Sequence, residues 1–150
     1  MKYLVGLLAV ISIFAITHAQ GPDSQKNEMP AYHPAPPAKG AVLPPVWTKK
    51  QLENAGYTDP AQTAAYQAAA RIDGVLYQLP CFSYCDRNHG HQSLRSCFEG
   101  DYAAHCGICK KESLYAYKMS KKGWNPTMIR NGIVRGDYKT IDLEHPDPVN

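Results

Sequence analysis

The sequence predicts a small, mainly α-helical domain with irregular loops and a concentration of cysteine and histidine. Apolar residues recur at helical spacing in several segments, and capping residues precede these segments. No segment shows the alternation of apolar and polar residues typical of β-strands. We therefore divide the chain into an export signal (1–19), a Pro-rich tether (20–47), a Cys/His-rich helical domain (48–138) and a C-terminal tail (139–150).

Residues 1–19 have the features of a removable signal peptide. Lys2 supplies a positive charge, an apolar run extends from Leu4 to Ile16, and Ala19 is the small residue expected before the cleavage site. The apolar run is shorter than the roughly 20 residues that span a bilayer. We expect an exported protein, periplasmic or extracellular, with no transmembrane segment after signal cleavage. An uncleaved N-terminal anchor is the alternative.

The segments on either side of the domain are expected to be loosely structured. Residues 20–47 contain seven prolines and no apolar period, so we expect an extended tether. Residues 139–150 include Pro146 and Pro148, and we expect a loose tail.

Capping signals predict the first two helices of the domain. Thr48 can cap a short helix that ends at Gly56. Asp59 can cap a second helix, in which Pro60 occupies the first position and which Gly74 ends.

The second half of the domain combines a loop with two further helices. Pro80 excludes a regular helix across residues 79–104, where Ser93 can cap a short turn. A long helix is expected over residues 103–122, and Asn125-Pro126 begins another.

All five cysteines, and three of the six histidines, lie within residues 81–109. Thiolate and imidazole groups at these spacings are typical of a tetrahedral site for Zn²⁺ or Cu⁺. The candidate metal ligands are Cys81, Cys85, His91, Cys97, His105, Cys106, Cys109 and Glu112.

Within this set, Cys106 and Cys109 are expected at a helix start and to act with Cys81 or Cys85. Cys97 shares a helical face with two apolar residues, so core packing is its simpler role.

Glu112 falls on the apolar stripe of the long helix, together with His105 and Cys109, when the residues are placed at about 100° intervals. A carboxylate in that position must be paired, protonated or coordinated. It can ligate the metal ion or orient His105, or it can form a salt bridge with a nearby Lys or Arg.

The charge pattern argues against nucleic acid as a partner, because Lys and Arg number 16 against 13 Asp and Glu. Between residues 110 and 135, five Lys and two Arg accompany a single acid, Glu112. These basic C-terminal helices form either a solvated face or a docking surface for an acidic protein partner.

Other functions remain open. The five cysteines can instead form two disulfides and leave one thiol, in a disulfide-braced interaction subunit of a cell-envelope assembly. A thiol–disulfide oxidoreductase is the third candidate. We assign no catalytic residues, because the chain has neither a phosphate-binding glycine loop nor a nucleophile-elbow serine.

A combination of motifs extends over roughly residues 65–134. Its parts are Leu79-Pro-Cys-Phe-Ser-Tyr-Cys-Asp86, Gly90-His-Gln-Ser-Leu94, Cys97-Phe98, His105-Cys-Gly-Ile-Cys109, Glu112 and Ile129-Arg130. This combination resembles the exported bacterial proteins known by the motif Pro-Cys-Tyr-Cys-Gly/His-Cys, the PCYCGC family. The resemblance implies soft-metal or redox chemistry. Ser83 stands where that family usually has its central cysteine, which explains the odd cysteine count, and the chain lacks the lipobox of many members.

Overall fold

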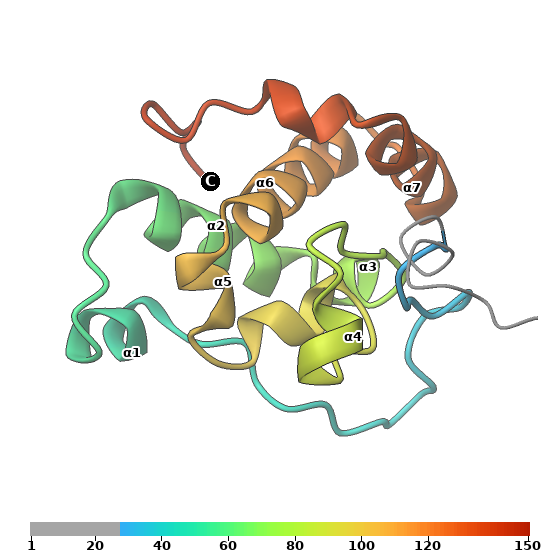
Figure 1. Ribbon diagram of the computed structural model, residues 1–150, viewed down its shortest axis with the longest axis horizontal. Helices are drawn as coiled ribbons and strands as arrows, with labels where there is room; N and C mark the ends of the chain where they lie inside the picture. The colour runs from blue at the N-terminus through green and yellow to red at the C-terminus, as the bar shows by residue number, and fades with distance from the viewer. Residues whose placement is uncertain (1–27) are drawn as a thin grey trace, which may run out of the picture.

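The computed structural model describes residues 28–150, so the predicted signal peptide and the start of the tether lie outside the described residues (Figure 1). Residues 28–150 fold into helices and loops without a β-strand, which confirms the mainly α class. The helices are α1 (Lys49–Asn54), α2 (Pro60–Arg71), α3 (Asp73–Leu76), α4 (Cys85–His89), η2 (Leu94–Phe98), α5 (Tyr102–His105), α6 (Gly107–Lys121), α7 (Pro126–Arg135) and η3 (Asp137–Thr140).

The predicted caps begin three of these helices. The side chains of Thr48 and Asp59 each accept a hydrogen bond from the backbone of the first turn and complete a capping box. Asn125 caps α7, and Pro126 follows it at the first helical position. Gly74 differs from expectation: α2 ends at Arg71, and Gly74 lies inside the short helix α3.

The predicted long helix over residues 103–122 is in fact two helices. Cys106 has an extended backbone (φ −101°, ψ 105°), which separates α5 from α6. Its sulfur accepts a hydrogen bond from the Cys109 amide and so caps α6. Because the helix restarts at Gly107, the helical projection that placed His105 beside Glu112 does not apply.

Helix α6 runs through the middle of the domain (Figure 1). Its most extensive contacts are with α2, and η3 and α7 also pack against it. The buried Ser113 hydroxyl donates a hydrogen bond to the Ala65 carbonyl at 2.9 Å and ties α6 to α2. Tyr66 of α2 meets Phe98 of η2 edge to face, with ring centroids 4.9 Å apart. The core therefore joins the two long helices to the loop region that carries the cysteines.

Residues 28–47 of the Pro-rich segment form neither helix nor strand, and they lie along the domain instead of standing free of it (Figure 1). The His33 ring stacks on Tyr77 with centroids 3.8 Å apart, and the Ala31 amide donates to Asp86 at 3.0 Å. The buried Arg95 guanidinium holds the Pro44 carbonyl at 2.7 Å. Aromatic and charged side chains of the domain thus hold this segment in place.

The C-terminal tail also packs on the domain. The Tyr117 hydroxyl donates to the Asn150 carbonyl, and Lys118 forms an ion pair with Asp147 at 3.0 Å. The expectation of a loose tail is therefore wrong for residues that contact α6.

No helix within residues 28–150 has the length and apolar character needed to cross a lipid bilayer.

Candidate metal centre

A sharp turn brings the first two cysteines of the cluster together. Buried Leu79 and Pro80 lead into Cys81, and the Tyr84 amide donates to the Cys81 carbonyl at 3.0 Å. Tyr84 then adopts a left-handed conformation (φ 56°, ψ 33°), which is uncommon for a residue with a side chain. This turn, which no sequence signal predicted, starts α4 at Cys85, so the side chains of Cys81 and Cys85 both enter the core.

Two other elements complete a cluster of four buried thiols. Cys97 lies on η2 and Cys109 on α6, and neither side chain is exposed. The sulfur atoms of Cys85 and Cys97 are 3.3 Å apart, and those of Cys81 and Cys109 are 3.4 Å apart. Those of Cys81, Cys85 and Cys97 all lie within 4.8 Å of one another. We call these four residues the thiol cluster; all are free cysteines.

The position of Cys97 combines the two roles that the sequence suggested for this residue, core packing and metal ligation. Cys97 is buried as expected, but its sulfur also contacts Cys85 and lies 3.4 Å from His91 Nδ1. The two roles are compatible because η2, a 3-10 helix, lies against the turn that carries Cys81 and Cys85. The Leu94 amide donates a hydrogen bond to the Leu79 carbonyl at 2.8 Å and holds η2 there. Helical periodicity in one segment cannot reveal such a contact between segments.

Ser83 and His91 supply oxygen and nitrogen atoms at the edge of the thiol cluster. Ser83 Oγ lies 3.1 Å from the sulfur of Cys81 and 3.6 Å from that of Cys109. His91 meets Cys97, and its ring packs against Tyr102. The Ser83 hydroxyl therefore points at the cluster.

Glu112 lies beside this site, completely buried. Its Oε1 accepts a hydrogen bond from the Phe82 amide at 2.9 Å, whereas Oε2 has no protein partner. Burial raises the pKa of this carboxyl well above its ordinary value, which favours its protonated form. No Lys or Arg within residues 28–150 forms an ion pair with it, so no basic side chain of this part of the chain supplies the predicted salt bridge.

The structure does not bring His105 into the thiol cluster. Its side chain is 66% exposed, and its Nε2 lies 2.7 Å from the Tyr57 hydroxyl. The cause is the break at Cys106, which turns α5 away from the direction of α6. Both predicted roles that depend on His105, as a ligand and as a group oriented by Glu112, are incompatible with this geometry.

Cys106 stands at the border of the thiol cluster and is only half-buried. Hydrogen bonds from the Cys109 thiol and the Cys109 amide lower its pKa to about 6, against the opposing effect of burial. Deeper in the site, hydrogen bonds from the Cys109 and Cys81 thiols lower the pKa of Cys85. These hydrogen bonds favour the thiolate form of Cys106 and Cys85 over that of the other thiols.

This arrangement matches the requirements of a soft or borderline metal ion. Tetrahedral Zn²⁺ with Zn–S bonds of about 2.3 Å separates its sulfur ligands by about 3.8 Å. The observed separations, 3.3 and 3.4 Å within pairs and up to 4.8 Å within the trio, bracket that value. Cys81, Cys85 and Cys97 are thus positioned to hold a metal ion, and Cys109 lies next to them.

The chain matches no known family model, no curated protein and no solved structure.

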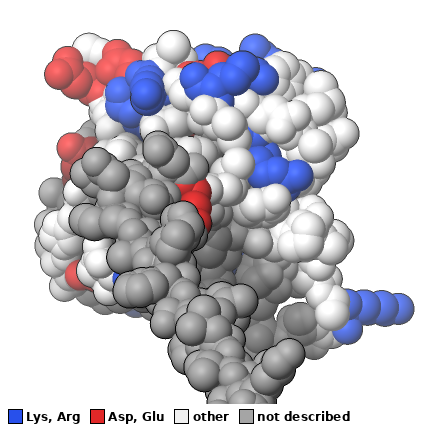
Figure 2. Space-filling model, turned by 45° about the vertical axis from the view of Figure 1, so that its right-hand side comes forward, with Lys and Arg blue, Asp and Glu red and all other residues white. Residues whose placement is uncertain are grey.

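Acidic side chains lie beside the Lys and Arg side chains of the basic C-terminal helices. Figure 2 shows Lys and Arg side chains along the upper edge of one face, with acidic side chains beside them. Several of the basic groups are engaged within the domain: Arg135 pairs with Asp137 at 2.7 Å, and Arg130 donates to the Gln78 carbonyl.

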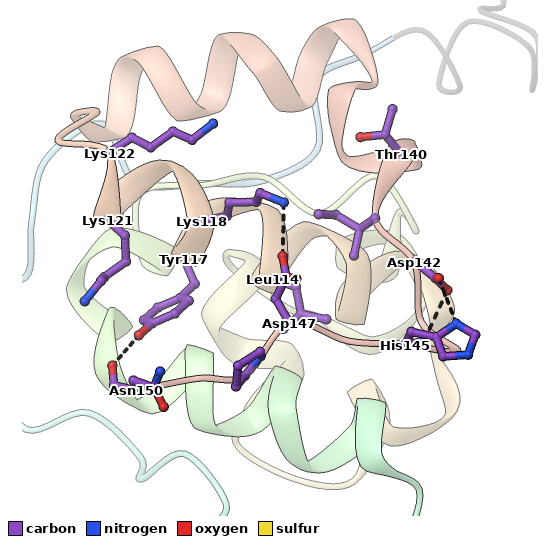
Figure 3. Close-up of a pocket in the computed structure, with 12 residues that line it drawn as sticks. Leu114, Tyr117, Lys118, Lys121, Lys122, Thr140, Asp142, His145, Asp147 and Asn150 are labelled. Atoms are coloured by element: carbon purple, nitrogen blue, oxygen red, sulfur yellow. Dashed lines mark hydrogen bonds and ion pairs between the residues drawn. The ribbon is translucent and has the colours of Figure 1, made fainter.

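A hollow of about 480 Å³ lies between α6 and the tail (Figure 3). The polar groups that line it pair mostly with one another, as Lys118 does with Asp147 and His145 with Asp142. It lies on the tail side of α6 and includes none of the cysteines.

Proposed function

We propose that this protein binds one soft or borderline metal ion, Zn²⁺ or Cu⁺, through Cys81, Cys85 and Cys97, with Cys109 as the fourth ligand. The observation that supports this most directly is the convergence of four buried sulfur atoms from three separate elements. Metal–sulfur bonds to a bound ion would offset the cost of burying these sulfur atoms as thiolates.

Because the site is buried, a bound metal ion should be retained and should exchange slowly with solvent. With Cys97 and Cys109 unexposed, an ion held here is shielded from water and from competing ligands. This supports a structural or buffering site in an exported protein more than a fast carrier. The proposal also agrees with the soft-metal chemistry that the PCYCGC resemblance implies.

The decisive experiment is a titration of the reduced, metal-free protein with Zn²⁺ and, separately, with Cu⁺, followed by native mass spectrometry. We expect one Zn²⁺ per chain, lost on denaturation. Absence of binding by the reduced protein would contradict the proposal and favour the disulfide-braced interaction subunit.

A further inference from the structure

The thiol cluster is divided into two pairs of sulfur atoms. Cys85 meets Cys97 at 3.3 Å, and Cys81 meets Cys109 at 3.4 Å. A disulfide bond measures about 2.05 Å, so each pair needs to close by only about 1.3 Å. We propose that reaction with an external disulfide converts the cluster into the disulfides Cys85–Cys97 and Cys81–Cys109, with Cys106 as the entry thiol, and thereby releases the metal ion. The release step rests on the proposed function; the pairing does not.

Accessibility assigns the entry role to Cys106. The four paired cysteines are between 0% and 3% exposed, so an external disulfide cannot reach their sulfur atoms without opening the core. Cys106 is half-buried and contacts the paired Cys109, whose amide donates to its sulfur at 3.3 Å. It is therefore both reachable from solvent and adjacent to the cluster.

Each oxidation begins at Cys106 and is completed inside the cluster. The Cys106 thiolate attacks the external disulfide, forms a mixed disulfide and expels one external thiolate. Cys109 attacks the Cys106 sulfur of this mixed disulfide and expels the second external thiolate. Cys81 then attacks the Cys109 sulfur, which forms Cys81–Cys109 and returns Cys106 as a thiolate.

Further exchange moves this bond to the other pair. Cys85 attacks the Cys81 sulfur, which lies within 4.8 Å, and Cys97 attacks the Cys85 sulfur in turn. The first oxidation equivalent then resides in Cys85–Cys97, with Cys81 and Cys109 again reduced. A second external disulfide restores Cys81–Cys109. In total, four protein thiols are oxidised, and two external disulfides are reduced to four thiols.

The metal ion and the disulfides exclude one another because they use the same sulfur atoms. A sulfur in a disulfide is neither charged nor an effective ligand for Zn²⁺. Oxidation therefore removes the thiolate ligands, and bound Zn²⁺ in turn protects them from oxidation.

The test begins with the reduced, metal-free protein and oxidised glutathione. Free thiols are alkylated after oxidation, and the chain is digested with trypsin and chymotrypsin, which cleave on both sides of Cys85 and of Cys97. We expect a loss of four hydrogens, linked peptides for Cys85–Cys97 and Cys81–Cys109, and alkylated Cys106. A Cys106–Cys109 bond as the final product overturns the pairing.

Two variants separate the steps. Cys106→Ser should slow the loss of thiols about tenfold or more and leave the final pairing unchanged. An unchanged rate overturns the entry role. Cys97→Ser should retain Cys81–Cys109 and lose two hydrogens instead of four, provided that circular dichroism shows an intact fold; a new partner for Cys85 overturns the fixed pairing.

The release step is measured on protein loaded with Zn²⁺, with a chromophoric chelator to report the free ion. We expect one equivalent of Zn²⁺ to appear in parallel with thiol loss. Retention of Zn²⁺ by the doubly oxidised protein overturns the release. If the disulfides form but the reduced protein never binds Zn²⁺, the proposed function fails while the pairing stands.

Discussion

Glu112 holds the turn that carries the first cysteines: its Oε1 accepts the Phe82 amide hydrogen bond at 2.9 Å across 30 residues of sequence. The second oxygen is buried without a protein partner. Glu112 thus connects the middle of α6 to the residue that follows Cys81. We infer that its main role is to position the Cys81 turn.

The buried Glu112 carboxyl should make stability depend on pH. Its raised pKa means that the folded protein keeps this proton at pH values at which the unfolded chain, with a pKa of about 4.3, has lost it. The stabilising free energy contributed by this group is therefore fully present below the unfolded-state pKa. It is lost as pH rises through the folded-state pKa. Glu112→Gln keeps an acceptor for Phe82 and should remove this decline.

Urea denaturation of the reduced, metal-free protein between pH 4 and pH 8 measures this effect. We expect the stability of Glu112→Gln relative to wild type to increase with pH. Glu53→Gln is the matched control, because Glu53 is an exposed residue that pairs with Lys49 at 3.6 Å. A relative stability of Glu112→Gln that is constant with pH would show that this carboxyl ionises normally.

Cys97 and Cys106 should differ in their importance for metal binding. Cys97→Ser removes a sulfur from the buried trio and should weaken Zn²⁺ binding by about 100-fold or more, beyond the roughly 10–100-fold typical of outer-shell changes. Cys106→Ser removes a half-buried thiol outside the trio and should change affinity by less than about tenfold. Competition with a chelator under reducing conditions gives both constants, and equal losses would contradict the ligand set.

Ser83→Cys should strengthen Zn²⁺ binding. The serine oxygen lies 3.1 Å from the Cys81 sulfur and 3.6 Å from the Cys109 sulfur, so a thiol at this position joins the cluster. Ser83→Ala is the control, because it removes the hydroxyl without adding a ligand. The Cd²⁺–thiolate absorbance, which grows with the number of bound sulfur atoms, should increase for Ser83→Cys alone; identical spectra for the three proteins would place residue 83 outside the coordination sphere.

The parts of the fold that the sequence predicts are those set by local chemistry. The caps at Thr48, Asp59 and Asn125 depend on side chains that bond to the next turn of their own helix. Sequence also locates the metal-competent residues, because all the cysteines lie close together along the chain.

The features that the sequence does not predict are local departures from helical backbone geometry and contacts between distant segments. The break at Cys106 replaces one helix by two, and the left-handed Tyr84 aims Cys85 inward. The docking of His33 on Tyr77 joins residues 44 positions apart. Periodicity and composition describe one segment at a time, so they assigned His105 to the site and could not show which of the candidate cysteines meet.

The last prediction concerns the close approach of α6 and α7. A Cβ atom added at Gly132 of α7 would overlap the Tyr115 hydroxyl oxygen, so either the ring or the helix must move. Tyr115 is buried and its hydroxyl donates to Asp137, which restricts its movement. Gly132→Ala should therefore destabilise the domain by about 1–3 kcal/mol, as overpacked cores do.

Thermal denaturation of the reduced protein checks this value against Gly74→Ala. Gly74 is also helical, but an added Cβ meets nothing within 4 Å, so alanine there should be neutral or should stabilise by up to about 1 kcal/mol through its higher helix propensity. The two variants add the same methyl group and differ in what it meets. We expect a lowered melting temperature for Gly132→Ala alone, because only there does the added methyl group meet the α6–α7 contact. Equal stability of the two variants would mean that the Tyr115 side chain can move without loss of stability.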